Sequence, residues 1–537
     1  MHGVLCRLEL HVQIAVLDLV GRDIRRDAAK VGHALFIRRE ILKFGETDGA
    51  AIGELHDHLA LRAAGRLRRL PRARRRDDAS IRKGEQSVLL TNLTALYPDL
   101  MEVVNLFEGG AELNISHVFE QKDGAYAHAV AVEGVPFSFF YPRPDNPSER
   151  EEKRLLKRSA KLAVYRALSS YTGKRMPWGS LTGIRPTKLA YQQGADFERF
   201  FREEMLVSPE KTALIAQILD AQRGIYEKND DNGDLFVGIP FCPSRCAYCS
   251  FVSGDIRKNA ALVEPYVEAL VREIAASKPL VKKLRSVYIG GGTPVALPFP
   301  LLRKVLDAVG PQSAEYTVEA GRPDAISREN LALLRDYGVT RICLNPQTFQ
   351  DRTLRLIGRN HTVRDIYDRY PLTKGFSVNM DLIAGLPGER FADFKDSIDR
   401  CIELDPDNVT VHTLCLKRGA ALKEETDRLP AGEVAEMVEY AHAALAERGY
   451  RPYYLYRQKY MAGNLENTGY AKPGTACVYN VDIMEEIAQN VACGANAVSK
   501  AVFGGGERIE RYGSPKDIPS YLAKLDRIIE EKRKLFC

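Results

Sequence analysis

Three cysteines lie close together in the chain and could bind metal. Cys242, Cys246 and Cys249 form a C-x3-C-x2-C pattern after an apolar, β-rich run, in the segment VGIPFCPSRCAYCSF at 237–251. Thiolates at this spacing can bind three irons of a cubane iron–sulfur cluster. A structural zinc site is the alternative, but such zinc takes four protein ligands, and no fourth Cys or His stands nearby. Three ligands leave one iron open, so the pattern indicates a [4Fe-4S] cluster that can bind a small molecule.

This loop resembles that of the radical S-adenosylmethionine (SAM) superfamily, and IPFC…C…YC followed by GGGTP resembles its coproporphyrinogen dehydrogenase branch. The resemblance implies two cofactors, a [4Fe-4S] cluster held by Cys242, Cys246 and Cys249, and SAM. In that family the free iron chelates SAM, and one electron from the cluster cleaves it to a 5′-deoxyadenosyl radical. The radical chemistry then belongs to the cofactors, whereas the protein supplies positioning and excludes water.

Further motifs resemble the SAM pocket of this family. GGGTP at 290–294 resembles the site for the SAM amino group, since glycines let the backbone approach a ligand. By itself, the same sequence would also be typical of an ordinary βα turn. TVEAGRP at 317–323 contains a glutamate that suits an ammonium or ribose hydroxyls. NPQTFQDRTLRLIGRNH at 345–361 and MDLIAGLPGE at 380–389 add polar side chains. The SAM contacts that the resemblance implies are Tyr248, Gly291, Gly292, Thr293, Glu319, Gln347, Arg359 and Asp381.

Six apolar, β-rich runs must position these motifs. They lie at 234–239, 286–289, 315–319, 340–344, 377–383 and 408–414, with helical segments between most of them. Alternating strands and helices predict an α/β fold with a parallel sheet and right-handed crossovers. Six units are too few to close an eight-unit barrel, so we predict a partial (β/α)6 TIM-like barrel. Its active face should lie at the carboxyl ends of the strands.

Patterning outside these runs predicts further domains. Residues 87–147 predict a small α/β N-terminal domain, and a capping box of Ser148 and Glu151 begins a helical connector at 148–232. The partial barrel is expected at 233–430 and a C-terminal α+β extension at 431–537. No stretch reaches the roughly 18 apolar residues of a membrane helix. We therefore expect a cytoplasmic protein without stable membrane insertion.

Residues 1–86 differ in composition from the rest. Residues 1–82 carry 17 Lys and Arg against 11 Asp and Glu, whereas the remaining chain carries 60 of each. The basic segment could be a nucleic-acid or membrane-surface arm, a disordered tail, or residues translated from an upstream start. The sharp break in composition near Ser87 favours the last two. Because the rest of the chain is neutral, we expect no nucleic-acid partner.

Within this branch, some proteins are oxidases and others are heme chaperones, and the chain has features that bear on both functions. WGSLTGIRPTKL at 178–189, TVHTLCLKRGA at 410–420, YMAGNLENTGYAKPG at 460–474 and GANAVSK at 494–500 resemble HemZ-type proteins. The HemW-type heme chaperone has a His-Asn element where this chain has Glu466 and Asn467, so a heme-ligating imidazole is absent. The oxidase subgroup has a further cysteine where this chain has Phe251, and a tyrosine where it has Phe236.

The resemblance therefore implies oxygen-independent oxidative decarboxylation of coproporphyrinogen III to protoporphyrinogen IX, a step of heme and porphyrin biosynthesis. Coproporphyrinogen III or a related tetrapyrrole is the expected substrate, and flavodoxin or ferredoxin is the expected type of electron donor. Candidates for pairing with substrate propionates, or simply for surface charge, are Lys417, Arg418, Arg457 and Lys459. The alternatives are a heme-binding transfer protein with an inherited cluster, and another radical SAM reaction on a tetrapyrrole, such as methyl transfer.

Overall fold

The computed structural model describes residues 89–537 apart from 108–109, 123, 184, 250–252, 313, 416–429 and 459–460. The predictions for residues 1–86, Phe251, Lys417, Arg418 and Lys459 thus lie outside the described residues. Backbone contacts divide the chain into a smaller unit, Leu113–Ala163 with the residues described up to Tyr97, and a larger unit, Pro98–Glu112 with Val164–Cys537. The finer division predicted at 87–147, 148–232, 233–430 and 431–537 stays a proposal.

The smaller unit is built on a four-stranded sheet in chain order. Its strands are β1 (Leu89–Thr91), β2 (Ile115–Lys122), β3 (Ala125–Val132) and β4 (Val135–Pro142). The helix α5 (Glu149–Thr172) begins here, where Ser148 Oγ accepts a hydrogen bond from the Glu151 backbone N–H at 3.3 Å, as the predicted cap requires. Burial lowers the pKa of His117 to about 4 and of His128 to about 3, so both stacked rings stay neutral near pH 7.

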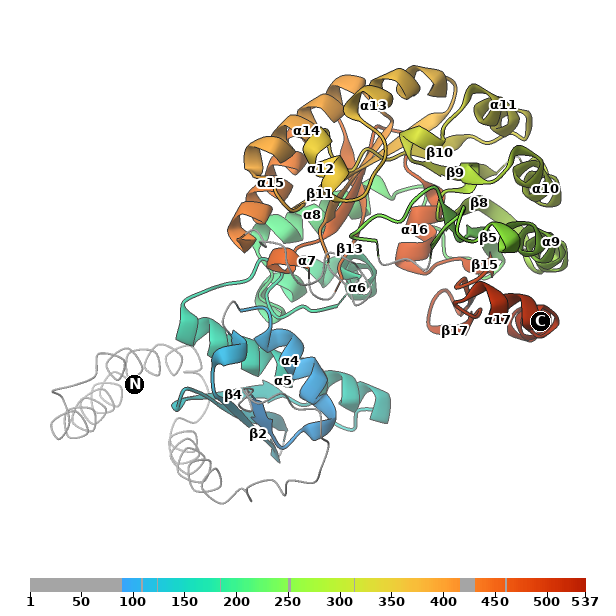
Figure 1. The fold of residues 1–537 in the computed structure, drawn as a ribbon. Coiled ribbons are helices and arrows are strands. Elements are labelled where there is room, and N and C mark those ends of the chain that lie inside the picture. Colours follow the sequence, from blue (N-terminus) through green and yellow to red (C-terminus); the bar gives the residue numbers. More distant parts are fainter. Residues whose placement is uncertain are drawn as a thin grey trace, which may run out of the picture. The chain divides into compact units, whose positions relative to one another are not determined.

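The larger unit is built on an eleven-stranded sheet with six parallel strands in chain order at its centre (Figure 1). They are β5 (Asn232–Ile239), β8 (Lys283–Gly291), β9 (Glu315–Gly321), β10 (Arg341–Leu344), β11 (Ser377–Ala384) and β12 (Asn408–Thr413). Between them run α9 (Ala260–Ser277), α10 (Phe299–Val309), α11 (Arg328–Asp336), α12 (Asp351–Leu356), α13 (Val363–Arg369) and α14 (Phe391–Leu404). The predicted partial barrel of six strand-and-helix units is thereby confirmed.

The C-terminal residues extend this sheet at both edges. Next to β12 lie β14 (Asn467–Ala471) and then β13 (Arg451–Tyr456), both in antiparallel pairing. Next to β5 lie β15 (Gln489–Cys493), in parallel pairing, and then β16 (Val498–Phe503) and β17 (Arg508–Gly513). An open sheet of six strands would leave unpaired backbone groups at its edges, and these strands satisfy them.

The two faces of the six central strands differ in chemistry. Alternate side chains of each strand, such as Val287, Val318 and Met380, pack with the helices in one large apolar cluster. Successive side chains of a strand point to opposite faces, so the residues between them line the other face. Most of these are polar, and they are Asp234, Ser286, Tyr288, Glu315, Thr317, Glu319, Arg341, Cys343, Asn379, Asp381, Asn408, Thr410 and His412. The concave inner face of the barrel is therefore a polar wall.

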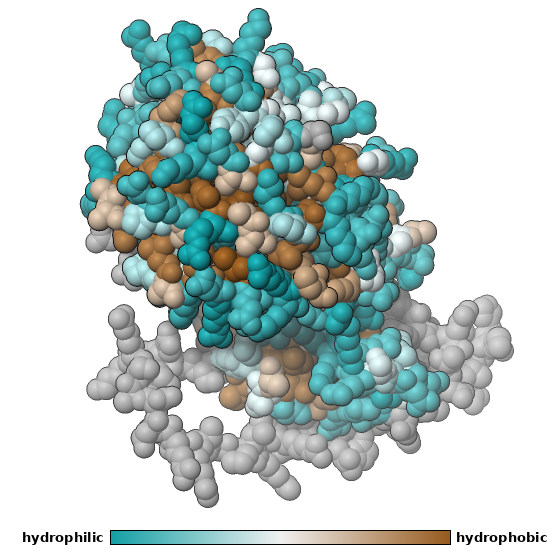
Figure 2. Space-filling model, turned by 90° about the vertical axis from the view of Figure 1, so that its right-hand side faces the viewer, coloured by the Kyte–Doolittle hydropathy of each residue, from teal (hydrophilic) through white to brown (hydrophobic). Residues whose placement is uncertain are grey.

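Among the described residues, further α-helices and one π-helix lie outside the stretch between β5 and β12. They are α4 (Tyr97–Val104), α6 (Pro186–Gln193), α7 (Phe197–Arg199), a π-helix (Phe200–Glu204), α8 (Pro209–Ala221), α15 (Ala431–Glu447), α16 (Val478–Glu485), α17 (Ile518–Ala523) and α18 (Leu525–Phe536). None of the described helices is long and apolar enough to cross a membrane. Hydrophilic side chains cover much of the face seen in Figure 2, with apolar side chains between them.

Candidate active site

The cysteine loop begins where β5 ends. Cys242 is the last residue of β6 (Phe241–Cys242), a short strand paired with β7 (Gly254–Asp255). The backbone N–H of Ala247 donates to the carbonyl of Ile357 at 2.9 Å, and Ser244 Oγ donates to the carbonyl of Gly358 at 3.2 Å. The loop is thus held against the segment that follows α12, and the thiols of Cys242, Cys246 and Cys249 are all partly exposed.

The three thiols fit an iron–sulfur cluster. Burial raises the pKa of Cys242, and the neighbouring Cys249 and Cys246 raise it further, against hydrogen bonds from Thr293 and Ser253. Metal binding replaces the proton of such a thiol. No three His, Cys, Asp or Glu side chains converge on one ion position in the part of the chain that the structure describes. A cubane makes a different demand, because each thiolate binds its own iron.

The glycine turn, which begins with the last two residues of β8, Gly290 and Gly291, contacts Glu319. The backbone N–H of Gly291 donates to Oε2 of Glu319 at 3.0 Å, and the hydroxyl of Tyr288 donates to Oε1 at 2.7 Å. A Cβ at position 290 would lie 2.7 Å from Cδ of Glu319. Glycine at this position therefore lets the carboxylate lie directly against the turn.

The same turn contacts the cysteine strand. A Cβ on Gly292 would lie 2.5 Å from the carbonyl oxygen of Phe241. The backbone N–H of Thr293 donates to that oxygen at 2.8 Å, and Thr293 Oγ1 donates to the sulfur of Cys242 at 3.6 Å. The turn thus joins the proposed cluster ligand to the proposed SAM contacts.

Glu319 has an unusual charge state for a carboxyl group. Burial raises its pKa to about 7, and the nearby Asp381 adds to this, while hydrogen bonds from Tyr288 and Gly291 oppose it. Near neutral pH the side chain is therefore partly protonated. An ammonium group beside it would favour the carboxylate, so Glu319 suits a cationic ligand.

Arg359 lies beside the cysteine loop. It is 7% exposed, and its two terminal nitrogens donate to the carbonyl of Asn345 at 2.6 Å and to the hydroxyl of Tyr248 at 3.4 Å. Burial lowers its pKa, but Tyr248 and Cys246 outweigh this and raise it, so it stays charged. Its Nε has no partner in the structure. A buried guanidinium with a spare donor fits a ligand carboxylate.

Gln347 and Asp381 meet between β10 and β11. Gln347 has a φ of +70°, which is rare outside glycine, and its backbone N–H donates to the carbonyl of Asp381 at 2.8 Å. Oδ1 of Asp381 accepts from Asn379 Nδ2 at 2.7 Å, and Oδ2 lies 3.6 Å from Nε2 of His412. Burial alone would raise the pKa of Asp381, but His412 and the hydrogen bonds hold it below its ordinary value. Asp381 is therefore a carboxylate at neutral pH.

The structure brings the predicted site residues to one edge of the sheet, at or after the carboxyl halves of β5 and β8–β11. It adds Tyr288, Asn379 and His412, which the motifs did not single out. Their signal in the sequence is a polar residue at every second position of the apolar runs. Arg457 is not available to a substrate propionate, because it is 3% exposed and donates to the carbonyls of Leu181 and Asn464.

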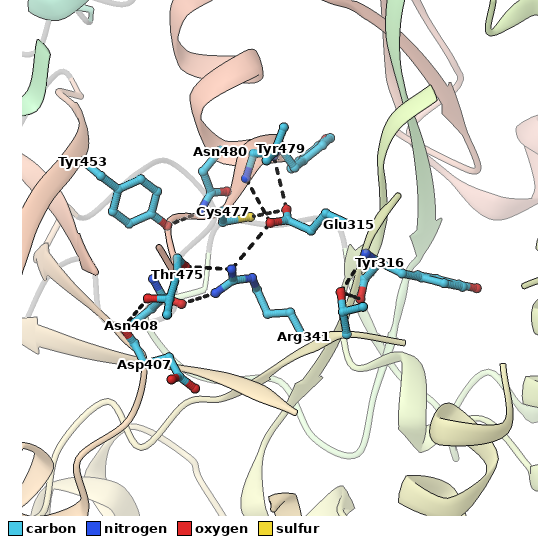
Figure 3. Close-up of polar contacts among 12 residues, drawn as sticks. Glu315, Tyr316, Arg341, Asp407, Asn408, Tyr453, Thr475, Cys477, Tyr479 and Asn480 are labelled. Carbon is cyan, nitrogen blue, oxygen red and sulfur yellow. Dashed lines mark hydrogen bonds and ion pairs between the residues drawn. The ribbon is translucent and has the colours of Figure 1, made fainter. Parts of the chain in front are cut away.

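A second polar cluster lies on the inner face toward the amino ends of the strands (Figure 3). Glu315 pairs with Arg341 at 3.5 Å and accepts hydrogen bonds from Cys477 Sγ and from the first backbone N–H of α16, both at 3.1 Å. This holds α16 against the sheet, where the ring of Tyr479 stacks on that of Tyr288 at 4.5 Å. The cluster thus supports the tyrosine that contacts Glu319.

Comparisons with known proteins show which family this chain belongs to. The model of the radical SAM superfamily matches residues 236–401. The oxygen-independent coproporphyrinogen-III oxidase-like protein HemZ of Bacillus subtilis is 35% identical over 476 residues, 83% of this chain and 94% of that protein. The heme chaperone HemW of Lactococcus lactis is 35% identical over 228 residues, 40% of this chain and 59% of that protein.

Among solved structures, the coproporphyrinogen III oxidase HemN of Escherichia coli is 22% identical, with a TM-score of 0.46 over 60% of this chain and 73% of that chain. The relationship to HemZ extends over nearly the whole length of that protein. The chain therefore belongs to the radical SAM superfamily, in the family of oxygen-independent coproporphyrinogen-III oxidase-like proteins that includes HemZ, and its cofactors are a [4Fe-4S] cluster and SAM.

Proposed function

We propose that this radical SAM enzyme catalyses the oxygen-independent oxidative decarboxylation of coproporphyrinogen III to protoporphyrinogen IX. The observation that carries the proposal is the similarity to HemZ over 94% of its length. We assign the cluster to Cys242, Cys246 and Cys249. We assign SAM binding to Tyr248, Gly291, Gly292, Thr293, Glu319, Gln347, Arg359 and Asp381.

The side chains around the pocket have distinct roles in this proposal. The cluster and SAM, when bound, supply a carbon-centred radical that removes a hydrogen atom from substrate. Glu319 attracts the SAM ammonium, Arg359 its carboxylate, and Asp381 the ribose hydroxyls. Tyr288 holds Glu319 in place. The polar inner wall thereby orients the ligand.

The same reaction takes place at each of two propionate side chains. The propionate loses one hydrogen atom from the carbon attached to the pyrrole ring, and then one electron and CO2, which leaves a vinyl group. One electron from a donor such as flavodoxin or ferredoxin starts each cycle, and a one-electron acceptor takes up the electron at its end. Two SAM molecules are consumed for each protoporphyrinogen IX.

Heme transfer is the second candidate, because the HemW of Lactococcus lactis is 35% identical over a part of this chain. In the chaperone type a histidine stands where this chain has Glu466. Glu466 is 1% exposed, accepts a hydrogen bond from Trp178 and pairs with Lys211. A buried, paired carboxylate cannot offer heme an axial ligand, which favours the decarboxylase.

The experiment uses coproporphyrinogen III deuterated at the propionate carbon attached to the ring. The reconstituted full chain is incubated anaerobically with SAM and dithionite, and 5′-deoxyadenosine is analysed by mass spectrometry. Hydrogen removal precedes electron loss, so the readout does not depend on the acceptor. We expect one deuterium in the 5′-deoxyadenosine, and SAM cleavage that depends on the porphyrinogen.

The Cys246→Ala variant, which should lack a working cluster, is the negative control. Heme titration of the same preparation tests the second candidate. The proposal would be overturned in favour of heme transfer if the protein bound heme stoichiometrically, cleaved SAM at a rate independent of porphyrinogen, and formed 5′-deoxyadenosine without deuterium.

A further inference from the structure

His412 lies at the carboxyl end of β12, directly beside β11, and faces the proposed SAM pocket. Its Nε2 is 3.6 Å from Oδ2 of Asp381, and its side chain is 26% exposed. We infer that His412 is a positioning residue of the SAM pocket that acts by orienting the carboxylate of Asp381. The inference rests on the proposed contact between Asp381 and SAM, and extends it to a residue outside the motifs.

The carboxylate of Asp381 is held from two sides. Oδ1 accepts a hydrogen bond from Nδ2 of Asn379 at 2.7 Å, and Oδ1 of Asn379 accepts one from Thr410 Oγ1 at 3.0 Å. This fixes which way the amide points, because its oxygen is already paired with a hydroxyl. His412 approaches the other carboxylate oxygen. With both oxygens contacted, the carboxylate plane is defined before a ligand arrives.

The orientation of the imidazole is set by Tyr456 on β13. The tyrosine hydroxyl lies 3.4 Å from Nδ1 of His412, and the two rings meet edge to face with centroids 6.5 Å apart. Burial and the charge of Asp381 raise the pKa of Tyr456, so the hydroxyl keeps its proton. A hydroxyl that donates to Nδ1 leaves the ring proton on Nε2, the nitrogen that faces Asp381.

The charges around Asp381 explain why a histidine is useful there. The titratable groups that interact with it from other elements are Glu319 on β9, Cys343 on β10, Cys401 on α14, and Tyr454 and Tyr456 on β13. None of these groups carries a positive charge, so none of them favours the ionised form of Asp381. His412 faces Oδ2 of Asp381, and its contact favours the ionised carboxylate that accepts ribose hydroxyls.

The geometry also predicts which substitutions preserve the effect. The amide nitrogen of glutamine can take the place of Nε2, whereas that of asparagine takes the place of Nδ1. His412→Gln should keep the contact with Asp381, while His412→Asn should keep only the contact with Tyr456. A purely structural role would show no such difference between two amides in SAM affinity.

The test measures the SAM dissociation constant of the anaerobically reconstituted full chain, without porphyrinogen and with iron content and unfolding temperature as checks. We expect His412→Ala and His412→Asn to raise the constant about tenfold, and His412→Gln to stay near wild type. In an Asp381→Asn background, His412→Ala should add no further loss, because both act through one contact. His442→Gln on α15, where the ring packs on Tyr470, is the matched control.

Three outcomes would overturn the inference. His412→Ala could bind SAM like wild type although Asp381→Asn does not. The losses from Asp381→Asn and His412→Ala could add fully, which would mean that His412 contacts SAM itself. Asp381→Asn could leave SAM binding unchanged, which would also remove Asp381 from the proposed pocket. Because no porphyrinogen is present, a wrong tetrapyrrole assignment would leave all these readouts unaffected.

Discussion

Nε1 of Trp178 donates a hydrogen bond to Oε2 of Glu466 at 2.7 Å, across 288 residues of chain. Oε1 of the same carboxylate pairs with Nζ of Lys211 at 2.5 Å, and the guanidinium of Arg457 lies over the indole ring at 5.0 Å. The backbone carbonyl of Glu466 accepts a hydrogen bond from Thr413 Oγ1 at 2.9 Å, at the end of β12. This buried cluster therefore ties the segment around Trp178 to the strand that carries His412.

Replacing Glu466 should destabilise the protein. Glu466→Ala leaves the Lys211 ammonium and the Trp178 N–H buried without a partner, so the free energy of unfolding should fall by about 3–5 kcal/mol. Denaturant unfolding measures this. Glu530→Ala removes a carboxylate from an exposed pair with Lys534 and should change the value by less than about 0.5 kcal/mol. Equal effects of the two substitutions would show that the cluster around Glu466 contributes little.

Loss of any one cysteine of the loop should remove the cluster. Cys242→Ala, Cys246→Ala and Cys249→Ala each leave two thiolates for a cubane that needs three, so bound iron and sulfide should fall to background. The buried Cys401 and the exposed Cys537 provide controls, and their alanine variants should keep the cluster. Full iron content in a loop variant would show that its cysteine is not a ligand.

SAM binding should depend on pH through Glu319. Its pKa is raised to about 7, so the side chain is mostly protonated at about pH 6 and mostly ionised at about pH 8. Only the carboxylate attracts an ammonium, so the affinity for SAM should increase over this range, with release of a proton on binding at the lower pH. Anaerobic calorimetry in two buffers of different ionisation enthalpy measures both effects. Glu319→Gln should bind more weakly and lack the part of the pH dependence that Glu319 causes.

Substitutions at two glycines of the same turn should affect SAM binding and cluster binding differently. An added Cβ in Gly290→Ala meets Glu319, so SAM affinity should fall while iron content is kept. In Gly292→Ala the Cβ meets the backbone of Phe241 in the cysteine strand, so iron content should fall as well. Overpacking of this kind costs about 1–3 kcal/mol. Gly513→Ala, where nothing lies within 4 Å of the added Cβ, is the control and should retain both cofactors.

Removal of residues 1–86 should leave cofactor binding unchanged. The reason is composition, since residues 1–82 carry the net positive charge of the chain and the rest has a net charge of zero. A chain that begins at Ser87 should match the full chain in iron content and in SAM affinity. Loss of cluster or of solubility in the shortened chain would show that the segment supports the enzyme body.

Much of the fold, and the grouping of the candidate site residues at one edge of the sheet, could be predicted because the signals are local. The cysteine loop spans eight residues, so its three thiols are held near one another whatever the rest of the chain does. Alternation of polar and apolar residues within each strand, and of strands with helices along the chain, indicates a parallel sheet and places the motifs at its carboxyl edge.

Contacts between distant residues could not be predicted in this way. His412 meets Asp381 because β12 pairs beside β11. Arg457, a candidate either for pairing with substrate or for surface charge, is buried and lies over the ring of Trp178. The edges of the sheet are completed by strands that follow the barrel in the chain. Such contacts depend on which segments pack together in three dimensions, and a single sequence carries no local signal for that choice.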